Sequence, residues 1–247
     1  MKVLNNTALG QVVDLRLFAF LIIILFSHLT MAGQVNEVNE VNEANEVDLT
    51  QLKDDGIKRW ETKSFVDTTK YTLGDFHQQL SLKAFSRSAA SGLVLKKAIN
   101  LNKTPYINWR WLIENRLTPL AERTKKGDDF AARIYVVIDG GWRFWNTLSL
   151  NYVWSSNQAE GLVWDNPFAG ANVKMLSVRG QDSAVATWYE ERRNVYNDLI
   201  AVFGDKGSEE ANREAYSVID VVAIMTDTDN SEKEVTAYYG DIVFSAF

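Results

Sequence analysis

Ile107-Asn-Trp-Arg-Trp-Leu-Ile113 and Ser217-Val-Ile-Asp-Val-Val-Ala-Ile-Met225 are the two stretches that decide the fold class. In the first, apolar and polar residues alternate with a period of two, as in a β-strand with one buried face. This alternation puts Trp109 and Trp111 on one face and Arg110 on the other. The second stretch is almost continuously apolar, as a strand covered on both faces would be. Together they predict a domain built from packed sheets.

Similar short segments continue on either side of these two stretches. Further strands are predicted at 80–85, 92–99, 132–138 and 150–154.

Two segments have helical periodicity instead. An apolar stripe with a period near 3.6 predicts a helix over 190–203, ended by Gly204, and a second short helix is predicted over 208–215. Many strands with one or two short helices on connections predict a mainly β fold, a jelly-roll-like β-sandwich. A lipocalin-like closed barrel is the alternative that periodicity does not separate.

The amino-terminal segment has the order of parts of a secretory signal. Lys2 and Arg16 precede the ten-residue apolar run 17–26, and small or tolerated residues follow it. We therefore expect a signal peptide over 1–33 and an exported protein, periplasmic or extracellular. The alternative is an uncleaved amino-terminal anchor in the inner membrane, because the apolar stretch is close to the shortest length that spans a bilayer.

A Val-Asn-Glu triplet repeat follows the predicted signal. Its glutamates recur every third position, so the valines cannot form one helical stripe. An acidic, low-complexity spacer is expected over 34–56, and a single β-sandwich domain over 57–247.

The composition excludes several classes of chemistry. The chain has no cysteine and two histidines, of which His28 lies in the predicted signal. Disulfides, thiolate metal sites and cysteine nucleophiles are therefore excluded, and a zinc site with several imidazoles cannot form within one chain. No Gly-x-Ser-x-Gly nucleophile elbow occurs.

The formal net charge of −6 comes largely from the spacer, so the domain has no basic excess. Nucleic-acid binding depends on such an excess, and nucleic acid is not an expected partner. A glycan or another envelope component is the expected partner, and no stable membrane span remains if the signal is cleaved.

Several acidic residues occupy positions where a hard cation could bind. Asp227 and Asp229 follow a predicted buried strand, although their spacing differs from that of an EF-hand. Glu61 near the first strand and Asp241 in the last form a second candidate pair, because jelly-roll carbohydrate-binding modules often hold a structural calcium between terminal strands. Calcium is the only cofactor expected. The alternative is that these acids cap turns or face water.

Three of the eight tryptophans lie in polar loop contexts: Trp142, Trp145 and Trp164. Flat aromatic faces suit sugar rings, so these three are the candidate ligand-binding residues. The alternative is that they belong to the core.

Two arginines are predicted within strands, Arg110 and Arg133. A buried arginine needs a partner, because an unpaired buried charge is costly. Asp129 and Asp227 are the expected partners, which would make part of the acidic group structural.

A series of motifs in one order resembles a bacterial domain-of-unknown-function family, number 3047. These motifs include Pro105–Trp111, Gly127–Tyr135, Trp188–Val195, Met225–Asn230 and Tyr239–Ile242. The resemblance covers roughly residues 57–247 and departs at 138–145. It implies a galactose-binding-like β-sandwich and an exported protein, and it implies no reaction.

Three functions are compatible with these observations. A non-catalytic carbohydrate- or ligand-binding module of the cell envelope ranks first, and an envelope assembly or protein-interaction module second. A carboxylate-based polysaccharide hydrolase or lyase ranks third, because it requires two acids that face each other across a cleft.

Overall fold

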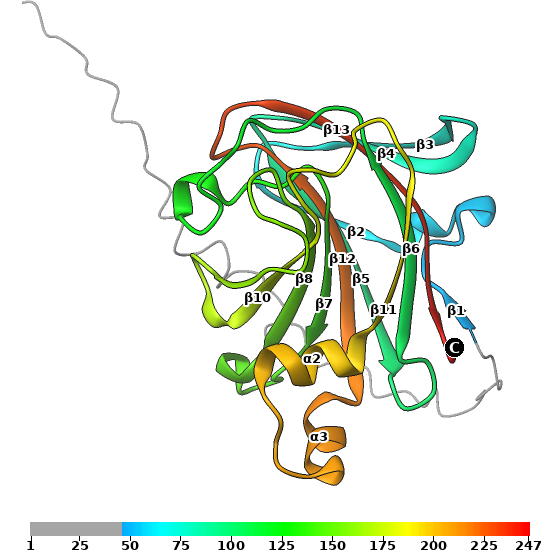
Figure 1. Cartoon of the computed structure of the whole chain (residues 1–247). Coiled ribbons are helices and arrows are strands. Elements are labelled where there is room, and N and C mark those ends of the chain that lie inside the picture. The colour runs from blue at the N-terminus through cyan, green and yellow to red at the C-terminus, as the bar shows by residue number, and fades with distance from the viewer. Residues whose placement is uncertain (1–45) are drawn as a thin grey trace, which may run out of the picture.

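The computed structural model describes residues 46–247, which form a sandwich of two β-sheets (Figure 1). Sheet A has the strand order β11-β6-β13-β4-β3, with β1 also paired to β13, and sheet B has the order β2-β5-β12-β7-β8-β10-β9. The strands of sheet A are β1 (Glu46–Asp48), β3 (Lys70–Phe76), β4 (Gln79–Arg87), β6 (Tyr106–Ile113), β11 (Tyr189–Asn194) and β13 (Glu234–Ser245). Those of sheet B are β2 (Glu61–Val66), β5 (Ala90–Asn100), β7 (Arg133–Ile138), β8 (Leu148–Trp154), β9 (Val163–Asn166), β10 (Gly170–Arg179) and β12 (Val218–Asp227).

This architecture confirms the mainly β, jelly-roll-like sandwich predicted from the sequence. Among the described residues, sheet A has the edge strands β11 and β3, and sheet B has the edge strands β2 and β9. The sheets therefore do not close into a barrel, which was the alternative. Each of the six predicted strand segments matches an observed strand, and only 132–138 and 217–225 begin one residue before it.

The core lies between the sheets and contains the tryptophans that the alternation placed inward. Trp109 and Trp111 are both buried, and their rings meet edge to face at 5.4 Å. Trp111 also contacts Trp154 of β8 in the opposite sheet at 5.7 Å. Arg110 points to the outer face of sheet A, where it pairs with Asp241. The predicted sidedness of β6 is therefore confirmed.

Residues 46–56, assigned to the spacer in the sequence analysis, are part of the folded sandwich. Residues 46–48 pair antiparallel with 243–245 of β13. Leu49 and Leu52 are buried, and the Leu52–Asp54 and Gly56–Arg59 turns of 3-10 helix lead into β2. The predicted signal and the remaining spacer, residues 1–45, lie outside the described residues.

The predicted helix over 190–203 is correct only in its second half. Helix α2 spans Val195–Phe203, capped by the Asn194 side chain, and the chain turns at Gly204 with φ 93°. The preceding residues form edge strand β11, because alternate side chains there face the core. Helix α3, Glu209–Tyr216, confirms the second helix. Within residues 46–247 no helix is long and apolar enough to cross a membrane.

Candidate functional site

Four aspartates gather at the start of β7 and the end of the neighbouring strand β12. Asp128 and Asp129 precede β7, whereas Asp227 ends β12 and Asp229 lies in the following turn. The two strands are antiparallel neighbours, so the start of one lies beside the end of the other. We call these four residues the acid cluster. Two motifs that carry the family resemblance, 127–135 and 225–230, meet here.

Arg133 is the only basic residue described within this cluster and is itself buried, at 2% exposure. Its guanidinium pairs with the carboxylate of Asp227, which is fully buried, and lies 3.9 Å from that of Asp128. The guanidinium also stacks 4.6 Å from the Phe130 ring centroid. The predicted pairing of Arg133 with Asp227 is therefore confirmed.

Asp129 organises the turn after β12 rather than pairing with an arginine. Its carboxylate accepts hydrogen bonds from the backbone N–H of Asn230 at 3.2 Å, from the Asn230 side-chain amide at 3.0 Å, and from the backbone N–H of Ser231 at 2.6 Å. The Asp128 carboxylate accepts from the Asn166 side-chain amide at 3.0 Å. Much of the cluster thus serves the fold, as the turn-capping interpretation required.

The charge of the cluster is unbalanced, because it contains four carboxylates and has one guanidinium beside it. Burial raises the pKa of Asp128 to about 7 and that of Asp229 to about 6, and it raises the pKa of Asp227 as well. Near neutral pH the cluster therefore retains protons that exposed carboxylates would have lost. A divalent cation could replace those protons.

Three members have the geometry to share a cation. One carboxylate oxygen each from Asp129, Asp227 and Asp229 lie within 4.8 Å of one another. The structure therefore brings two of the predicted metal ligands, Asp227 and Asp229, together with Asp129. The sequence feature that could have identified this third ligand is the position of Asp128 and Asp129 shortly before the apolar strand segment 132–138. The calcium ion itself stays a prediction.

Glu61 and Asp241, the other predicted ligands, lie elsewhere and in different sheets. Glu61 on β2 contacts Lys63 at 2.9 Å, and Asp241 on β13 contacts Arg110 at 3.2 Å. Each therefore has a basic partner of its own and neither belongs to the acid cluster.

The loop after β7 lies at the other end of the same strand and carries two exposed tryptophans. Trp142 is 75% exposed and Trp145 is 54% exposed, and their rings meet edge to face at 6.2 Å and 85°. The Arg143 guanidinium stacks over Trp142 at 4.6 Å. We call residues 139–147 the tryptophan loop.

Hydrogen bonds brace the tryptophan loop from within and from neighbouring strands. Gly140 N–H donates to the Thr147 hydroxyl at 3.0 Å, and Asp139 N–H donates to the Asp220 carboxylate at 2.8 Å. The Asn172 amide of β10 donates to the backbone carbonyl of Trp145 at 2.6 Å. These hydrogen bonds therefore fix the backbone that carries the two exposed indoles.

Trp164, the third predicted ligand-binding residue, does not join this loop. It is 7% exposed and packs on Phe130, with ring centroids 6.4 Å apart. Its place on β9, with the side chain toward the outer apolar cluster of sheet B, explains the burial.

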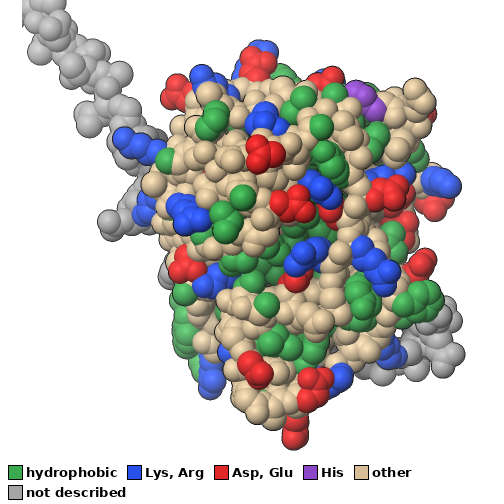
Figure 2. Space-filling model, in the orientation of Figure 1, with side chains coloured by type: hydrophobic (Ala, Val, Ile, Leu, Met, Phe, Trp, Pro, Cys, Tyr) green, Lys and Arg blue, Asp and Glu red, His purple; other side chains and the backbone are tan. Residues whose placement is uncertain are grey.

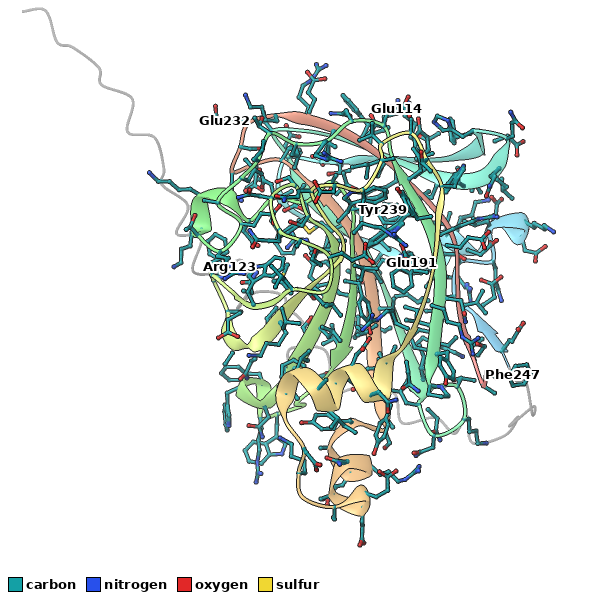
Figure 3. All side chains as sticks on the ribbon, viewed as in Figure 1. Glu114, Arg123, Glu191, Glu232, Tyr239 and Phe247 are labelled. Atoms are coloured by element: carbon teal, nitrogen blue, oxygen red, sulfur yellow. The ribbon has the colours of Figure 1, made fainter. Side chains whose placement is uncertain are left out.

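Glu191 on β11 is a further carboxylate that a hydrolase or lyase could use only if it were free of structural partners. The Arg179 guanidinium of β10 binds it with two hydrogen bonds, at 2.5 and 2.9 Å, and Trp111 Nε1 donates to it at 3.0 Å. Figure 3 shows Glu191 near the middle of the molecule. Because Arg179 belongs to sheet B and Glu191 to sheet A, this pair bridges the two sheets. The Glu191 carboxylate therefore has a structural role, since it joins the two sheets through Arg179 and Trp111.

The acids of the cluster do not face each other across an open cleft either. Asp128, Asp129 and Asp227 are each buried. A polysaccharide chain would not reach them, so the acid cluster does not have the geometry that a hydrolase or lyase requires.

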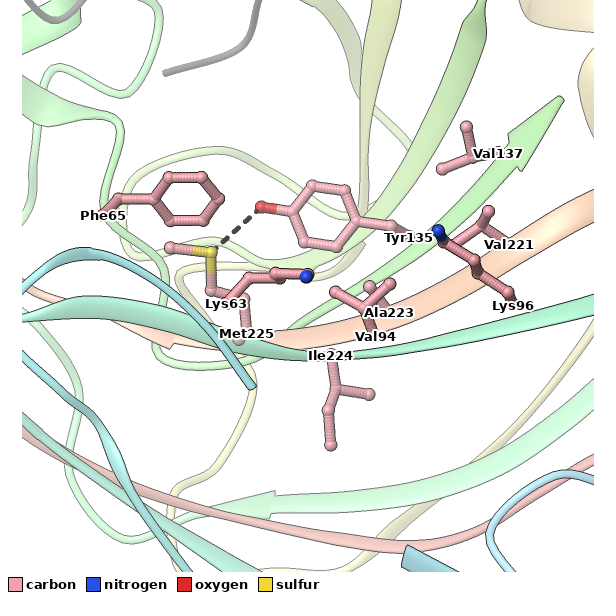
Figure 4. Close-up of a pocket in the computed structure, with 11 residues that line it drawn as sticks. Lys63, Phe65, Val94, Lys96, Tyr135, Val137, Val221, Ala223, Ile224 and Met225 are labelled. Atoms are coloured by element: carbon pink, nitrogen blue, oxygen red, sulfur yellow. Dashed lines mark hydrogen bonds between the residues drawn. The ribbon is translucent and has the colours of Figure 1, made fainter. Parts of the chain in front are cut away.

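A small apolar pocket lies on the outer face of sheet B (Figure 4). Its volume is about 40 Å³, and its walls include Val94, Tyr135, Val221 and Met225. The Tyr135 hydroxyl already donates to the Met225 sulfur at 3.3 Å. The pocket is too small for a sugar ring.

Fold and sites together define a mainly β, two-sheet sandwich with a buried acid cluster and an exposed aromatic loop. The chain belongs to the family described as "Protein of unknown function (DUF3047)", whose sequence pattern matches residues 58–243. No curated protein matches the chain.

Three solved structures share the outline of the fold at low similarity. The glycoside hydrolase domain of Endo-D from Streptococcus pneumoniae is 10% identical with a TM-score of 0.37, over 76% of this chain and 22% of that one. A Cel12A cellulase derived from Rhodothermus marinus is 9% identical with a TM-score of 0.40, over 80% and 98%. The xylan-binding module CBM86 from Roseburia intestinalis is 12% identical with a TM-score of 0.27, over 75% and 94%. The chain thus spans about a fifth of the Endo-D chain, and these scores carry no conclusion about ligand or activity.

Proposed function

We propose that this protein is a non-catalytic, carbohydrate-binding β-sandwich of the cell envelope. The observation that carries the proposal is the pair of exposed indoles, Trp142 and Trp145, on a loop that hydrogen bonds hold in place. Large apolar side chains exposed together usually mark a binding surface.

The arrangement of the tryptophan loop suits a sugar better than a purely apolar partner. An indole face covers the C–H face of a pyranose ring, while nearby polar groups bind its hydroxyls. Arg143 and Asn146 lie in the same loop and supply such groups. The perpendicular indoles offer two faces in different directions, which suits two sugar units or a bent chain.

Export is the second part of the proposal, and it rests on the sequence of residues 1–33. Amino-terminal sequencing of the protein recovered from cell fractions tests it. A new terminus near residue 33 in the periplasm or medium supports export, whereas an intact leader in the membrane fraction supports the anchor.

Affinity electrophoresis and a glycan array test the binding proposal directly. We expect the purified protein to be retarded by at least one polysaccharide, and Trp142→Ala/Trp145→Ala to lose at least about tenfold in affinity, since stacked aromatic pairs contribute on the order of 1 kcal/mol beyond their buried area.

Phe247→Ala is the matched control, because Phe247 is also a largely exposed aromatic residue but lies outside the loop. Unchanged binding in the control is expected. Failure of the wild-type protein to retain any sugar would count against the proposal. Retention of an envelope protein that depends on the same two tryptophans would favour the assembly module instead.

A further inference from the structure

A groove crosses the outer face of sheet A between β3 and β4, away from both sites described above. It has a volume of about 320 Å³ and is lined by Lys70, Thr72, Phe76, Lys83 and Phe85. Lys70 pairs in register with Phe85, and Thr72 with Lys83. Side chains of paired residues point to the same face of a sheet, and so do those of alternate residues along one strand. The five side chains therefore share the outer face of sheet A.

Gly74 shapes the aromatic wall of this groove. A Cβ at Gly74 would lie 3.1 Å from the Phe76 ring, so the ring occupies the space that a side chain at 74 would take. Phe76 is supported on its other side by Tyr238 of β13, with ring centroids 5.4 Å apart. The ring therefore lies along the sheet rather than pointing away from it.

The same two rings hold one of the lysines. The Lys83 ammonium lies 5.7 Å from the Phe76 ring centroid and 5.9 Å from that of Tyr238, within the range of cation–π attraction. Lys70 lies on the neighbouring strand, directly opposite Phe85. Two ammonium groups and two phenyl rings thus line one depression.

Neither lysine forms a salt bridge with any residue of the described chain, in contrast to other basic residues of this face. Arg87 contacts Glu234 at 2.8 Å, and Arg110 contacts Asp241 at 3.2 Å. Lys70 and Lys83 therefore carry positive charge that is not neutralised locally on this face.

We propose that this groove binds an acidic saccharide, with a pyranose ring against Phe76 and Phe85 and its carboxylate between the two ammonium groups. The Thr72 hydroxyl, which can donate and accept, lies where sugar hydroxyls would pass. The inference rests on the proposed carbohydrate-binding function and names the class of glycan, those that contain uronate units.

The chemistry of the groove favours a uronate over a nucleic acid. Nucleic-acid binding uses an extended basic track, whereas the lining of this groove contains two lysines. Basic and acidic side chains are interspersed over the face seen in Figure 2, and the chain carries a formal net charge of −6.

Titration calorimetry with a galacturonate oligomer, its carboxyl-reduced neutral form and a single-stranded oligonucleotide tests the inference. We expect the acidic oligomer to bind at least about tenfold more tightly than the neutral one at low salt, and the difference to shrink at 0.5 M salt because the Debye length falls. Lys70→Gln/Lys83→Gln should lose this preference. Lys97→Gln/Lys103→Gln, which removes the same charge from exposed positions elsewhere, should keep it.

Three results would overturn the inference: equal affinity for the two oligomers, an unchanged preference in Lys70→Gln/Lys83→Gln, or tighter binding of the oligonucleotide. The tryptophan-loop variant keeps the two proposals separate. If neutral glycans still bind through Trp142 and Trp145 and the acidic oligomer binds no more tightly than the neutral one, the groove proposal is wrong and the proposed function stands. If no glycan binds at all, both fail.

Discussion

Strand β7 runs from the acid cluster to the tryptophan loop. The two regions differ in whether the chain itself supplies partners for buried charges and covers apolar side chains. At the start of β7, three buried carboxylates and a half-buried one meet an arginine, backbone N–H groups and a side-chain amide of the same chain. At its end, two indoles are exposed to water although the backbone beneath them is held by hydrogen bonds. The first end supplies most of its own partners, whereas the second leaves its apolar surface uncovered. We infer that the first serves the fold and the second serves contact with other molecules.

Arg133→Met should produce the largest effect on the acid-cluster end. It leaves Asp227 and Asp128 buried without their counter-charge, and breaking a buried pair in this way costs about 3–5 kcal/mol. Urea denaturation at pH 7.5 measures the loss. Because the carboxylates can take up protons instead, the loss should be smaller at pH 5. A variant as stable as wild type at pH 7.5 would contradict the assigned pairing.

Calcium should act on the same end with the next largest effect, if Asp129 joins the two predicted ligands Asp227 and Asp229 in binding the ion. A ligand present at 100 times its Kd stabilises the folded state by roughly 2.7 kcal/mol, which is several degrees in Tm. Thermal melts with EDTA and then with calcium measure it, and Asp229→Asn should abolish the response while the exposed Asp182→Asn keeps it. Identical melts with and without calcium would end the calcium prediction.

The pH dependence of stability should show a smaller effect of the acid cluster. The folded state keeps protons on Asp128 and Asp229 up to pH values near 7 and 6, whereas ordinary aspartates release them near 3.8. The folded state therefore binds more protons than the unfolded state between these values, and stability falls as pH rises from about 4 to about 7.

In metal-free buffer Asp229→Asn should flatten part of this slope. A shift of one pKa unit corresponds to about 1.4 kcal/mol, and the partial exposure of Asp229 reduces its share to about 1 kcal/mol, or roughly 2–4 °C in Tm. An equal slope in both proteins would contradict the assigned protonation.

The tryptophan loop should give the smallest change in stability. Trp142→Ala/Trp145→Ala removes side chains that contribute little to the core, so the free energy of unfolding should stay within about 0.5 kcal/mol of wild type. A loss of several kcal/mol would show that this end also serves the fold, and the contrast between the two ends of β7 would then disappear.

The sequence predicted best where side chains face the core. Alternation in 107–113 placed Trp109, Trp111 and Arg110 correctly, because a one-residue slip would have exposed both indoles. Arg133 and Asp227 were also matched, since a charge within an apolar strand requires a partner.

It predicted less well where charged residues face inward. Glu190–Asn194 looked helical because its polar residues masked a period of two, and the inward Glu191 is tolerated only through the Arg179 pair across the sheets. The burial of Trp164 against Phe130 could not be read from its neighbours in sequence.

The proposed binding groove of sheet A was not predicted from the sequence, for a related reason. Residues 70–76 alternate, Lys-Tyr-Thr-Leu, which is a strand signal, but the groove depends on which strand lies beside them. Likewise, Asp129 joins Asp227 and Asp229 only because β7 and β12 are neighbours. Pairing between strands distant in the chain is not contained in local periodicity.

The short pair between β1 and β13 determines how mechanical load enters the domain. Glu46–Asp48 runs beside the last strand, so the point where the described chain begins lies next to the carboxyl end (Figure 1). A force applied at Glu46 would break the three residue pairs between β1 and β13 one after another, up to Leu49. The Leu49 backbone N–H donates to the Ile242 carbonyl at 2.9 Å, and its side chain is buried. Beyond that residue the load falls on β13, which lies in the interior of sheet A between β6 and β4.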